Sequence, residues 1–182
     1  MSAINIKDNL IEGVATRLSP NHDLRPIEED ISLLVIHAIS LPPGKYGGSY
    51  IEDFFLNTLN ISKHKYFESI KDLKVSSHLL IKRTGEIIQF VPFNKRAWHA
   101  GVSSYLGREK CNDFSIGIEL EGTDDSEFTN QQYNSLMIAS KALIETYPKL
   151  TKNRIVGHSD IAPERKTDPG IFFKWDRYLG DI

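Results

Sequence analysis

One stretch of the chain, VGHSDIAPERKTDPG at residues 156–170, gathers side chains that are suited to catalysis. Its histidine, lysine and aspartate (His158, Lys166 and Asp168) stand among two prolines, which restrict the backbone and predict a stiff loop without regular structure. In a locally extended segment, side chains two residues apart point to the same side, so Lys166 would lie beside Asp168. This pattern fits a metal site with a neighbouring cation, and it fits equally a surface loop with a salt bridge.

A second histidine interrupts the apolar run Leu33 to Ile39, whose β-branched residues predict a strand buried on both faces. An unpaired polar group there would be destabilising by a few kcal/mol, so His37 requires a partner. For His37 alone, a hydrogen-bonded core histidine is the simpler interpretation. If the fold brings His37 to His158 and Asp168, however, these three form the ligand set of a catalytic zinc site with one open position.

The strand predicted at residues 114–121 offers carboxylates for proton transfer. Its alternation would place Phe114, Ile116, Ile118 and Leu120 on one face, and Ser115, Gly117, Glu119 and Glu121 on the other. Two carboxylates beside a glycine suggest the floor of a site, although a solvated strand face gives the same pattern. In the first interpretation Glu119 takes a proton from zinc-activated water, and Lys166 stabilises an oxyanion. Together these residues predict metal-assisted hydrolysis of an amide or ester.

Residues 94–112 show little apolar periodicity and predict a long loop, which inside a compact domain is usually functional. Trp98, His99 and Tyr105 offer flat apolar faces for a sugar ring or a groove, and a loop packed on its own aromatic residues is an equal alternative. The same segment holds Cys111, the single cysteine of the chain. One cysteine excludes both an internal disulfide and a thiolate-rich zinc cluster.

The elements that must position these residues alternate between strands and helices. Helical spacing predicts helices at residues 50–59, about 65–73, 129–146 and 172–179, and strands are predicted at 75–83, 86–91 and 154–156. The strands at 75–83 and 86–91 would form a hairpin across Thr84 and Gly85. We therefore expect one α/β domain over residues 1–182, with a mixed central sheet flanked by helices. Residues 1–32, interrupted by Pro20 and Pro26, are expected to form an irregular arm packed on it.

Composition limits the partners of the protein. Hydrophobic residues at 40% and charged residues at 25% of the 182 are ordinary for a soluble globular domain. The net charge of -2 predicts no nucleic-acid partner, and no apolar run approaches the ~20 residues that span a membrane. No signal peptide is recognisable at the N-terminus, so we expect a cytoplasmic protein, working as a monomer on a small-molecule substrate.

Four strings carry a family resemblance: LLVIHAISLPPGKYGG, HLLIKRTGEIIQFVPFNKRAWHAGVSSY, CNDFSIGIELEG and GHSDIAPERKTDPG. Over residues 17–175 the chain resembles the zinc-dependent N-acetylmuramoyl-L-alanine amidases, and among them the cytosolic AmpD type that acts on 1,6-anhydro-muropeptides. The resemblance implies the fold shared with peptidoglycan-recognition proteins, zinc on His37, His158 and Asp168, and Glu119 and Lys166 at the reaction centre. It also implies a role in peptidoglycan recycling, by cleavage between anhydro-N-acetylmuramic acid and L-alanine.

The resemblance further places substrate contacts on five residues: Lys74, Trp98, His99, Ala100 and Lys110. Three positions depart from the family pattern, because Ala38 replaces an asparagine, and Lys74 and Lys110 replace arginines. A lysine offers a carboxylate a point charge instead of the paired donors of arginine. Two other functions share the fold: a non-catalytic muropeptide-binding module, and an exported autolysin acting on polymeric peptidoglycan. The complete ligand set argues against the first, and the missing signal peptide against the second.

Overall fold

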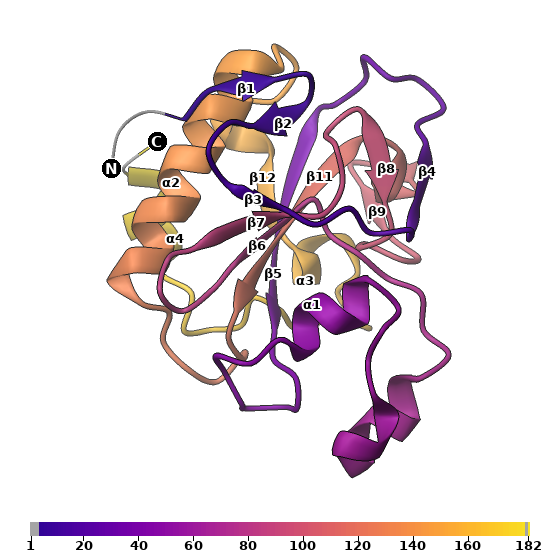
Figure 1. Cartoon of the computed structure of the whole chain (residues 1–182). Coiled ribbons are helices and arrows are strands. Elements are labelled where there is room, and N and C mark those ends of the chain that lie inside the picture. Colours follow the sequence, from indigo (N-terminus) through magenta and orange to yellow (C-terminus); the bar gives the residue numbers. More distant parts are fainter. Residues whose placement is uncertain (1–3, 181) are drawn as a thin grey trace.

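The computed structural model describes residues 4–180 and 182, which are organised around a six-stranded sheet (Figure 1). Its strand order is β12-β5-β11-β6-β7-β3. The strands are β3 (Ala15–Thr16), β5 (Leu33–Ile39), β6 (Leu79–Ile81), β7 (Ile87–Gln89), β11 (Ser115–Glu121) and β12 (Ile155–Gly157). The strands from β12 to β6 run parallel, whereas β7 pairs antiparallel with β6 and parallel with β3. The sheet is therefore mixed, and the hairpin predicted across Thr84 and Gly85 is confirmed.

The central strands β5 and β11 bury both of their faces. The alternate apolar residues on one face pack against helix α2 (Asn130–Thr146): Leu34, Ile36, Ile116, Ile118 and Leu120. Leu33 and Val35 join a separate cluster on the opposite face. The alternation predicts Phe114 beside Ile116, and that prediction is wrong. Phe114 precedes β11, so it does not follow the alternation of the strand and packs with Leu33 instead.

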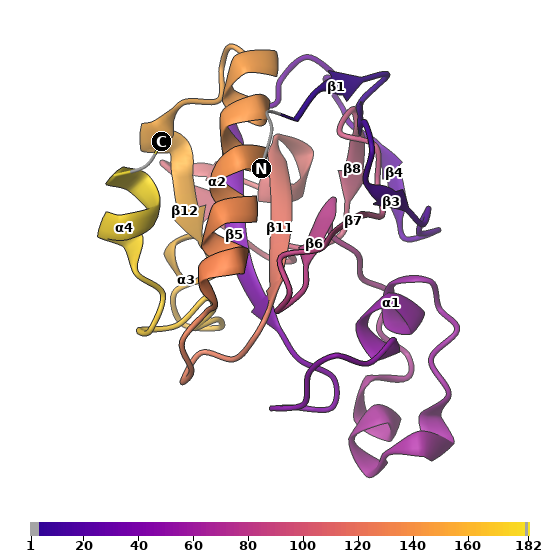
Figure 2. The same ribbon diagram turned by 60° about the vertical axis from the view of Figure 1, so that its left-hand side comes forward.

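Helix α2 covers one face of the sheet along β5 and β11 (Figure 2). Thr129 caps its N-terminus in a capping box, since its side chain accepts from the Gln132 backbone and the Gln132 side chain accepts from Thr129 N. Helix α4 (Trp175–Gly180) packs beside it, with Tyr178 hydroxyl 2.6 Å from Ser140 Oγ. The helix predicted at residues 129–146 is thus confirmed. No helix within residues 4–180 and 182 is both long and apolar enough to span a bilayer.

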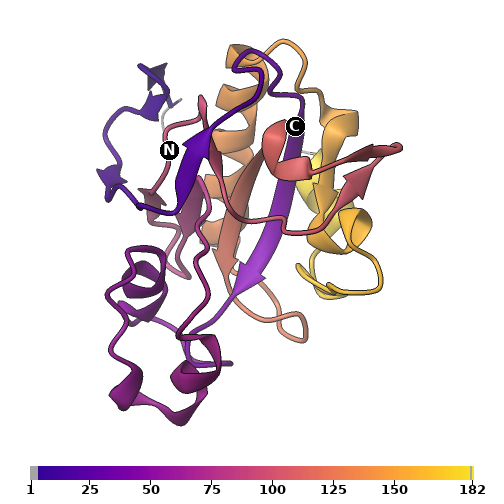
Figure 3. The ribbon, with the colours of Figure 1, turned by 90° about the vertical axis from the view of Figure 1, so that its right-hand side faces the viewer.

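The other helical elements are short. They are α1 (Tyr50–Phe55), α3 (His158–Ile161) and the 3-10 turns η1 (Ile61–Lys63), η2 (Lys65–Ile70), η3 (Cys111–Asp113) and η4 (Lys152–Arg154). The helix predicted at 50–59 ends at Phe55 because Asn57 adopts a left-handed backbone, with φ 59°. The helix predicted near 65–73 is a 3-10 turn. Figure 3 shows that α1 and the segment after it extend from one end of the sheet.

Two segments are more ordered than the sequence suggests. The expected irregular arm carries, besides β3, the strands β1 (Ile6–Lys7), β2 (Leu10–Ile11) and β4 (His22–Leu24). The expected loop at 94–112 holds β8 (Lys95–Ala97), which pairs with β4, and the hairpin of β9 (Ser104–Tyr105) and β10 (Arg108–Glu109). These short strands form by pairing with neighbouring backbone segments, which side-chain patterning does not reveal. Residues 1–3 lie outside the described part of the chain.

A buried polar pair ties the N-terminal arm to the sheet. His78 Nδ1 accepts a hydrogen bond from Gly117 N at 3.0 Å, which gives this histidine a structural role. Arg25 reaches in from the arm and donates to the Ser115 carbonyl at 2.7 Å, with Nη2 3.1 Å from His78 Nε2. Burial lowers the pKa of Arg25 to about 10. Burial and the nearby Arg25 charge lower the pKa of His78 well below its usual value, so this imidazole is neutral.

His78 should make the fold acid-sensitive. Below about pH 6.5 an unfolded histidine takes up a proton that native His78 excludes, so the free energy of unfolding should fall by up to about 1.4 kcal/mol per pH unit. This contribution is fully present above that pH and is lost as the pH falls towards the depressed native pKa. His78→Asn keeps an acceptor near Nδ1 and should flatten the slope. Urea unfolding of chelator-treated protein between about pH 5 and 7 measures it, and an unchanged slope would contradict this role.

Candidate active site

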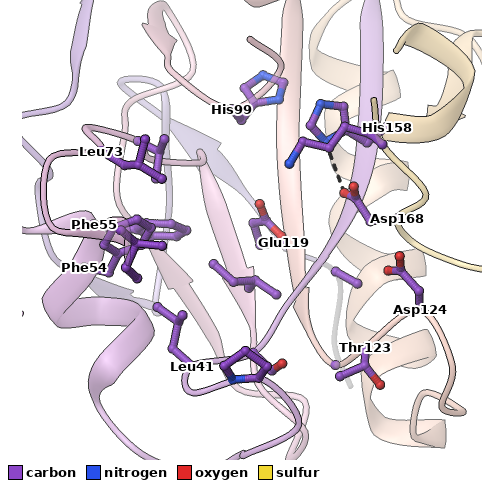
Figure 4. Close-up of a pocket in the computed structure, with 18 of the residues that line it drawn as sticks. Leu41, Phe54, Phe55, Leu73, His99, Glu119, Thr123, Asp124, His158 and Asp168 are labelled. Atoms are coloured by element: carbon purple, nitrogen blue, oxygen red, sulfur yellow. Dashed lines mark hydrogen bonds and ion pairs between the residues drawn. The ribbon is translucent and has the colours of Figure 1, made fainter. Parts of the chain in front are cut away.

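Three side chains from separate segments converge near the carboxyl end of β5. His37 Nδ1 lies 2.9 Å from His158 Nδ1, and both nitrogens are 3.2 Å from Asp168 Oδ2. Figure 4 shows His158 and Asp168 facing each other across this point. In residues 4–180 and 182 this is the one group of histidine, cysteine and acidic side chains placed to hold a metal ion, and all three members are buried.

Parallel pairing of β5 with β12 brings the two histidines together. The register sets Gly157 opposite Ile36, so His158 and His37 follow at the same level. His158 begins the single turn of helix α3. Irregular structure was predicted for residues 156–170, and over this turn that prediction is wrong. Asp160 Oδ2 caps the turn by accepting a hydrogen bond from Gly157 N at 2.7 Å. A Cβ on Gly157 would approach Pro169 Cδ to 2.9 Å. The glycine therefore leaves room for the returning loop.

The donor set fits zinc in type, spacing and protonation. Two imidazole nitrogens and a carboxylate oxygen stand 2.9–3.2 Å apart, close to the ~3.3 Å that separates tetrahedral ligands on bonds of 2.0–2.1 Å. Burial lowers the pKa of His37 to about 4. Burial opposes ionisation of Asp168, but its close contacts with His158 and His37 outweigh this effect and hold its pKa well below the usual range. Neutral imidazoles and an ionised carboxylate are the forms that bind metals.

Glu119 lies beside this group without belonging to it. Its Oε1 is 4.0 Å from His37 Nδ1, and its Oε2 is buried without a hydrogen-bond partner among the described residues. Burial, and then the charge of Asp168, raise the pKa of Glu119 well above its ordinary value. The Lys166 charge acts in the opposite direction from the same cavity. A carboxyl group with a raised pKa exchanges protons more readily near neutral pH.

Glu121 occupies a different environment, although it shares the strand face predicted for Glu119. Its carboxylate accepts hydrogen bonds from Gly47 N at 2.7 Å and from Arg83 N at 3.0 Å. Both partners belong to loops at the end of the sheet. Glu121 therefore anchors the segment after β5.

The cavity around Glu119 encloses about 480 Å³ and has two unlike walls. In Figure 4 Leu41, Phe54, Phe55 and Leu73 form the apolar side, and His158, Asp168 and Asp124 lie opposite, with Glu119 between them. Sequence reasoning missed the apolar wall. The helical spacing of Phe54 and Phe55 is typical of core packing, and no local signal shows that a packed helix also borders a cavity.

The predicted substrate residues are dispersed. His99 and Ala100 are buried, with His99 Nδ1 2.8 Å from His37 Nε2 and the Ala100 carbonyl 3.1 Å from His158 Nε2. Trp98 is half-buried and lies close to Asp23, whose pKa is lowered by Arg96 and, to a smaller extent, by Trp98. Lys74 is exposed at a small neighbouring cavity of about 40 Å³. Lys110 is exposed at a separate cavity of about 630 Å³, which Arg165 also lines. The structure thus places two of the five residues against the metal-site histidines.

Comparisons with known proteins agree with this geometry. A family model described as N-acetylmuramoyl-L-alanine amidase matches residues 27–171. The chain is 53% identical over 178 residues to a Haemophilus influenzae protein named 1,6-anhydro-N-acetylmuramyl-L-alanine amidase AmpD, covering 98% of this chain and 97% of that protein. A crystal structure of a selenomethionine AmpD derivative matches with a TM-score of 0.94 at 52% identity, over 97% of this chain and 98% of that one.

A third relative was solved with a muropeptide. The Escherichia coli amidase AmiD, in complex with the substrate anhydro-N-acetylmuramic acid-L-Ala-D-γ-Glu-L-Lys, matches with a TM-score of 0.61 at 29% identity. The match covers 98% of this chain and 65% of the AmiD chain. These similarities agree with the predicted mixed-sheet amidase fold. The chain belongs to the N-acetylmuramoyl-L-alanine amidase family.

Proposed function

We propose that this protein hydrolyses the amide bond between 1,6-anhydro-N-acetylmuramic acid and L-alanine in muropeptides, as a zinc enzyme of cytoplasmic peptidoglycan recycling. The observation that carries the proposal is the buried group of His37, His158 and Asp168, with Glu119 and Lys166 lining the same cavity. The names of the relatives support the substrate class, since the Haemophilus protein is named for the anhydro sugar. The AmiD complex supports it further, because its substrate has the same anhydro-muramoyl end.

His37 and His158 would hold zinc through their Nδ1 atoms, and Asp168 through Oδ2. When bound, zinc supplies Lewis acidity, which activates water for attack and polarises the amide carbonyl. Two of the three ligands need no deprotonation at neutral pH, because His37 is neutral and Asp168 is ionised in the folded protein.

Glu119 is the proposed proton carrier. It accepts the proton of the attacking water as the oxygen bonds to the carbonyl carbon, and it then returns that proton to the leaving amine of L-alanine as the C–N bond breaks. The open lone pairs of Oε2 suit this exchange. Lys166 is the proposed oxyanion stabiliser, because an ammonium in the same cavity offsets charge developing on the carbonyl oxygen. Neither residue is needed to hold the metal in this scheme.

The substrate has a rigid sugar at one end and peptide carboxylates at the other. Lys74 and Lys110 are both exposed, so they remain the proposed contacts for those carboxylates. Trp98, which is half-buried and precedes His99 in the chain, remains a proposed contact for the sugar. His99 lines the same cavity as Glu119 and remains a proposed substrate contact, and so does Ala100, whose carbonyl also contacts His158.

Mass spectrometry of reaction products tests the proposal. Purified zinc-loaded protein should release the free stem peptide from anhydro-muropeptide much faster than from intact sacculi, because the cavity suits a compact monomeric substrate. The same protein treated with a chelator is the control and should release little. Equal release from sacculi would favour an exported autolysin. No release from either substrate, with binding retained, would favour a non-catalytic muropeptide-binding module.

A further inference from the structure

Each of the two metal-site histidines has a second ring nitrogen that points away from the cluster. These outward nitrogens meet consecutive residues of one loop: His37 Nε2 lies 2.8 Å from His99 Nδ1, and His158 Nε2 lies 3.1 Å from the Ala100 carbonyl oxygen. A carbonyl only accepts, so His158 donates from Nε2 and keeps a lone pair on Nδ1. That lone pair faces His37 and Asp168, where the metal is proposed.

If Nδ1 of His37 is the metal ligand, the donor and the acceptor in the hydrogen bond between His37 and His99 are determined. A neutral imidazole with a lone pair on Nδ1 carries its proton on Nε2, so His37 donates to His99 Nδ1. His99 must then carry its own proton on Nε2, which lies 3.1 Å from Ser115 Oγ. The hydroxyl of Ser115 can accept a hydrogen bond from this N–H, since a hydroxyl both donates and accepts. Ser115 therefore accommodates the form of His99 that accepts from His37, and that form leaves the Nδ1 lone pair of His37 free for a metal.

The surroundings of His99 are shaped around its ring. A Cβ on Gly117 would stand 2.5 Å from both Cγ and Nδ1 of His99, so any other residue at 117 would displace the imidazole. The glycine in β11 suggested close approach of a ligand to the backbone, and the group that approaches is this histidine. The ring also meets His37 edge-on, with centroids 5.0 Å apart and planes at 87°.

The backbone of the same dipeptide is fixed from two sides. Asn112 Oδ1 accepts from His99 N at 3.2 Å and from Ala100 N at 2.8 Å. On the other side, Arg165 Nη2 donates to the Ala100 carbonyl at 2.7 Å and to the Val102 carbonyl at 2.7 Å. The acceptors that receive the two histidine protons are thus held in place before a metal binds.

We propose that His99 is a positioning residue, which fixes the tautomer and orientation of His37 for zinc through a hydrogen-bond chain ending at Ser115. Ala100 performs the same task for His158 with its carbonyl group. The inference rests on the proposed zinc site and gives His99 a role in metal binding besides its place in the cavity wall. Loss of such an outer partner typically weakens metal affinity by about 10–100-fold.

Zinc affinity, measured by chelator competition, tests the inference without relying on activity. His99→Leu and His99→Asn both remove the ring, but the asparagine oxygen sits near the former Nδ1 and still accepts from His37. We expect His99→Leu to weaken zinc binding by about 10–100-fold and His99→Asn to stay close to the parent value. Trp98→Leu is the matched control, because the side chain of this neighbour lies close to Asp23 and not against a metal-site histidine, and the variant should bind zinc like the parent.

A second measurement needs no variant. Nuclear magnetic resonance of the zinc-loaded parent, labelled with ¹⁵N, should show the His37 proton on Nε2 and a coupling across the hydrogen bond to His99 Nδ1. Equal weakening in His99→Leu and His99→Asn, or no weakening in either, would overturn the inference. If His99→Leu does not fold, the parent spectrum decides, and a His37 proton on Nδ1 refutes it. A parent protein that binds no zinc would instead refute the proposed function itself.

Discussion

Replacing His158 with alanine is expected to remove most of the zinc and, with it, the hydrolytic activity. The substitution deletes one of two imidazole donors and leaves Asp168 with a single histidine partner. A site with two remaining protein ligands binds zinc far more weakly than the three-ligand set of catalytic centres. Elemental analysis of purified parent protein should give close to one zinc per chain, and the variant should give a small fraction of that value.

The control for this experiment is His64→Ala, since His64 caps the 3-10 turn η2 and contacts Phe67 instead of the metal site. It should keep zinc and activity. The double variant His37→Ala, His158→Ala is the sharpest test, because only the carboxylate of Asp168 is left from the proposed ligand set. Full zinc occupancy in that variant would show that the metal is bound elsewhere in the chain.

Replacing Glu119 with glutamine is expected to leave zinc bound and to lower kcat by about 100-fold or more. The amide has nearly the same shape as the carboxylate, so the cavity keeps its volume, but it no longer accepts the proton of the attacking water. Lys166→Ala should also keep zinc and lower kcat by a similar factor, because the cavity loses its ammonium. Steady-state kinetics on anhydro-muropeptide, together with zinc analysis of each variant, separates chemistry from metal binding.

Glu121→Gln is the matched control for Glu119→Gln. Glu121 stands two residues along the same strand, and its carboxylate receives hydrogen bonds from the backbone of Gly47 and Arg83. The change should therefore affect loop placement more than proton transfer, with a much smaller loss of kcat. A retained kcat in Glu119→Gln, or loss of zinc from it, would reject the proton-transfer role proposed for Glu119.

The sequence by itself determined the elements whose signals are local. The apolar run around His37 marked a strand buried on both faces, and the alternation in β11 placed Glu119 opposite Ile116 and Ile118. Helical spacing predicted the long helix at residues 129–146, and the capping box of Thr129 that begins it joins residues only three apart. The residue types at positions 37, 158 and 168 also suggested a zinc ligand set. Four long strings carried the family resemblance, which the comparisons confirm.

Tertiary structure alone decided what depends on contacts between distant residues. The register of β12 on β5 sets His158 beside His37, and no pattern within either segment encodes that register. From the sequence, the aromatic residues around position 99 fitted a substrate surface as well as a loop packed on itself. In the structure His99 packs against Gly117 of β11 and is hydrogen-bonded to His37 of β5, and neither contact is visible in the sequence around position 99. Short strands such as β8 are stabilised by the strands with which they pair, here β4, and their composition does not predict them. The preference of a segment for strand structure depends on the neighbours that it packs against.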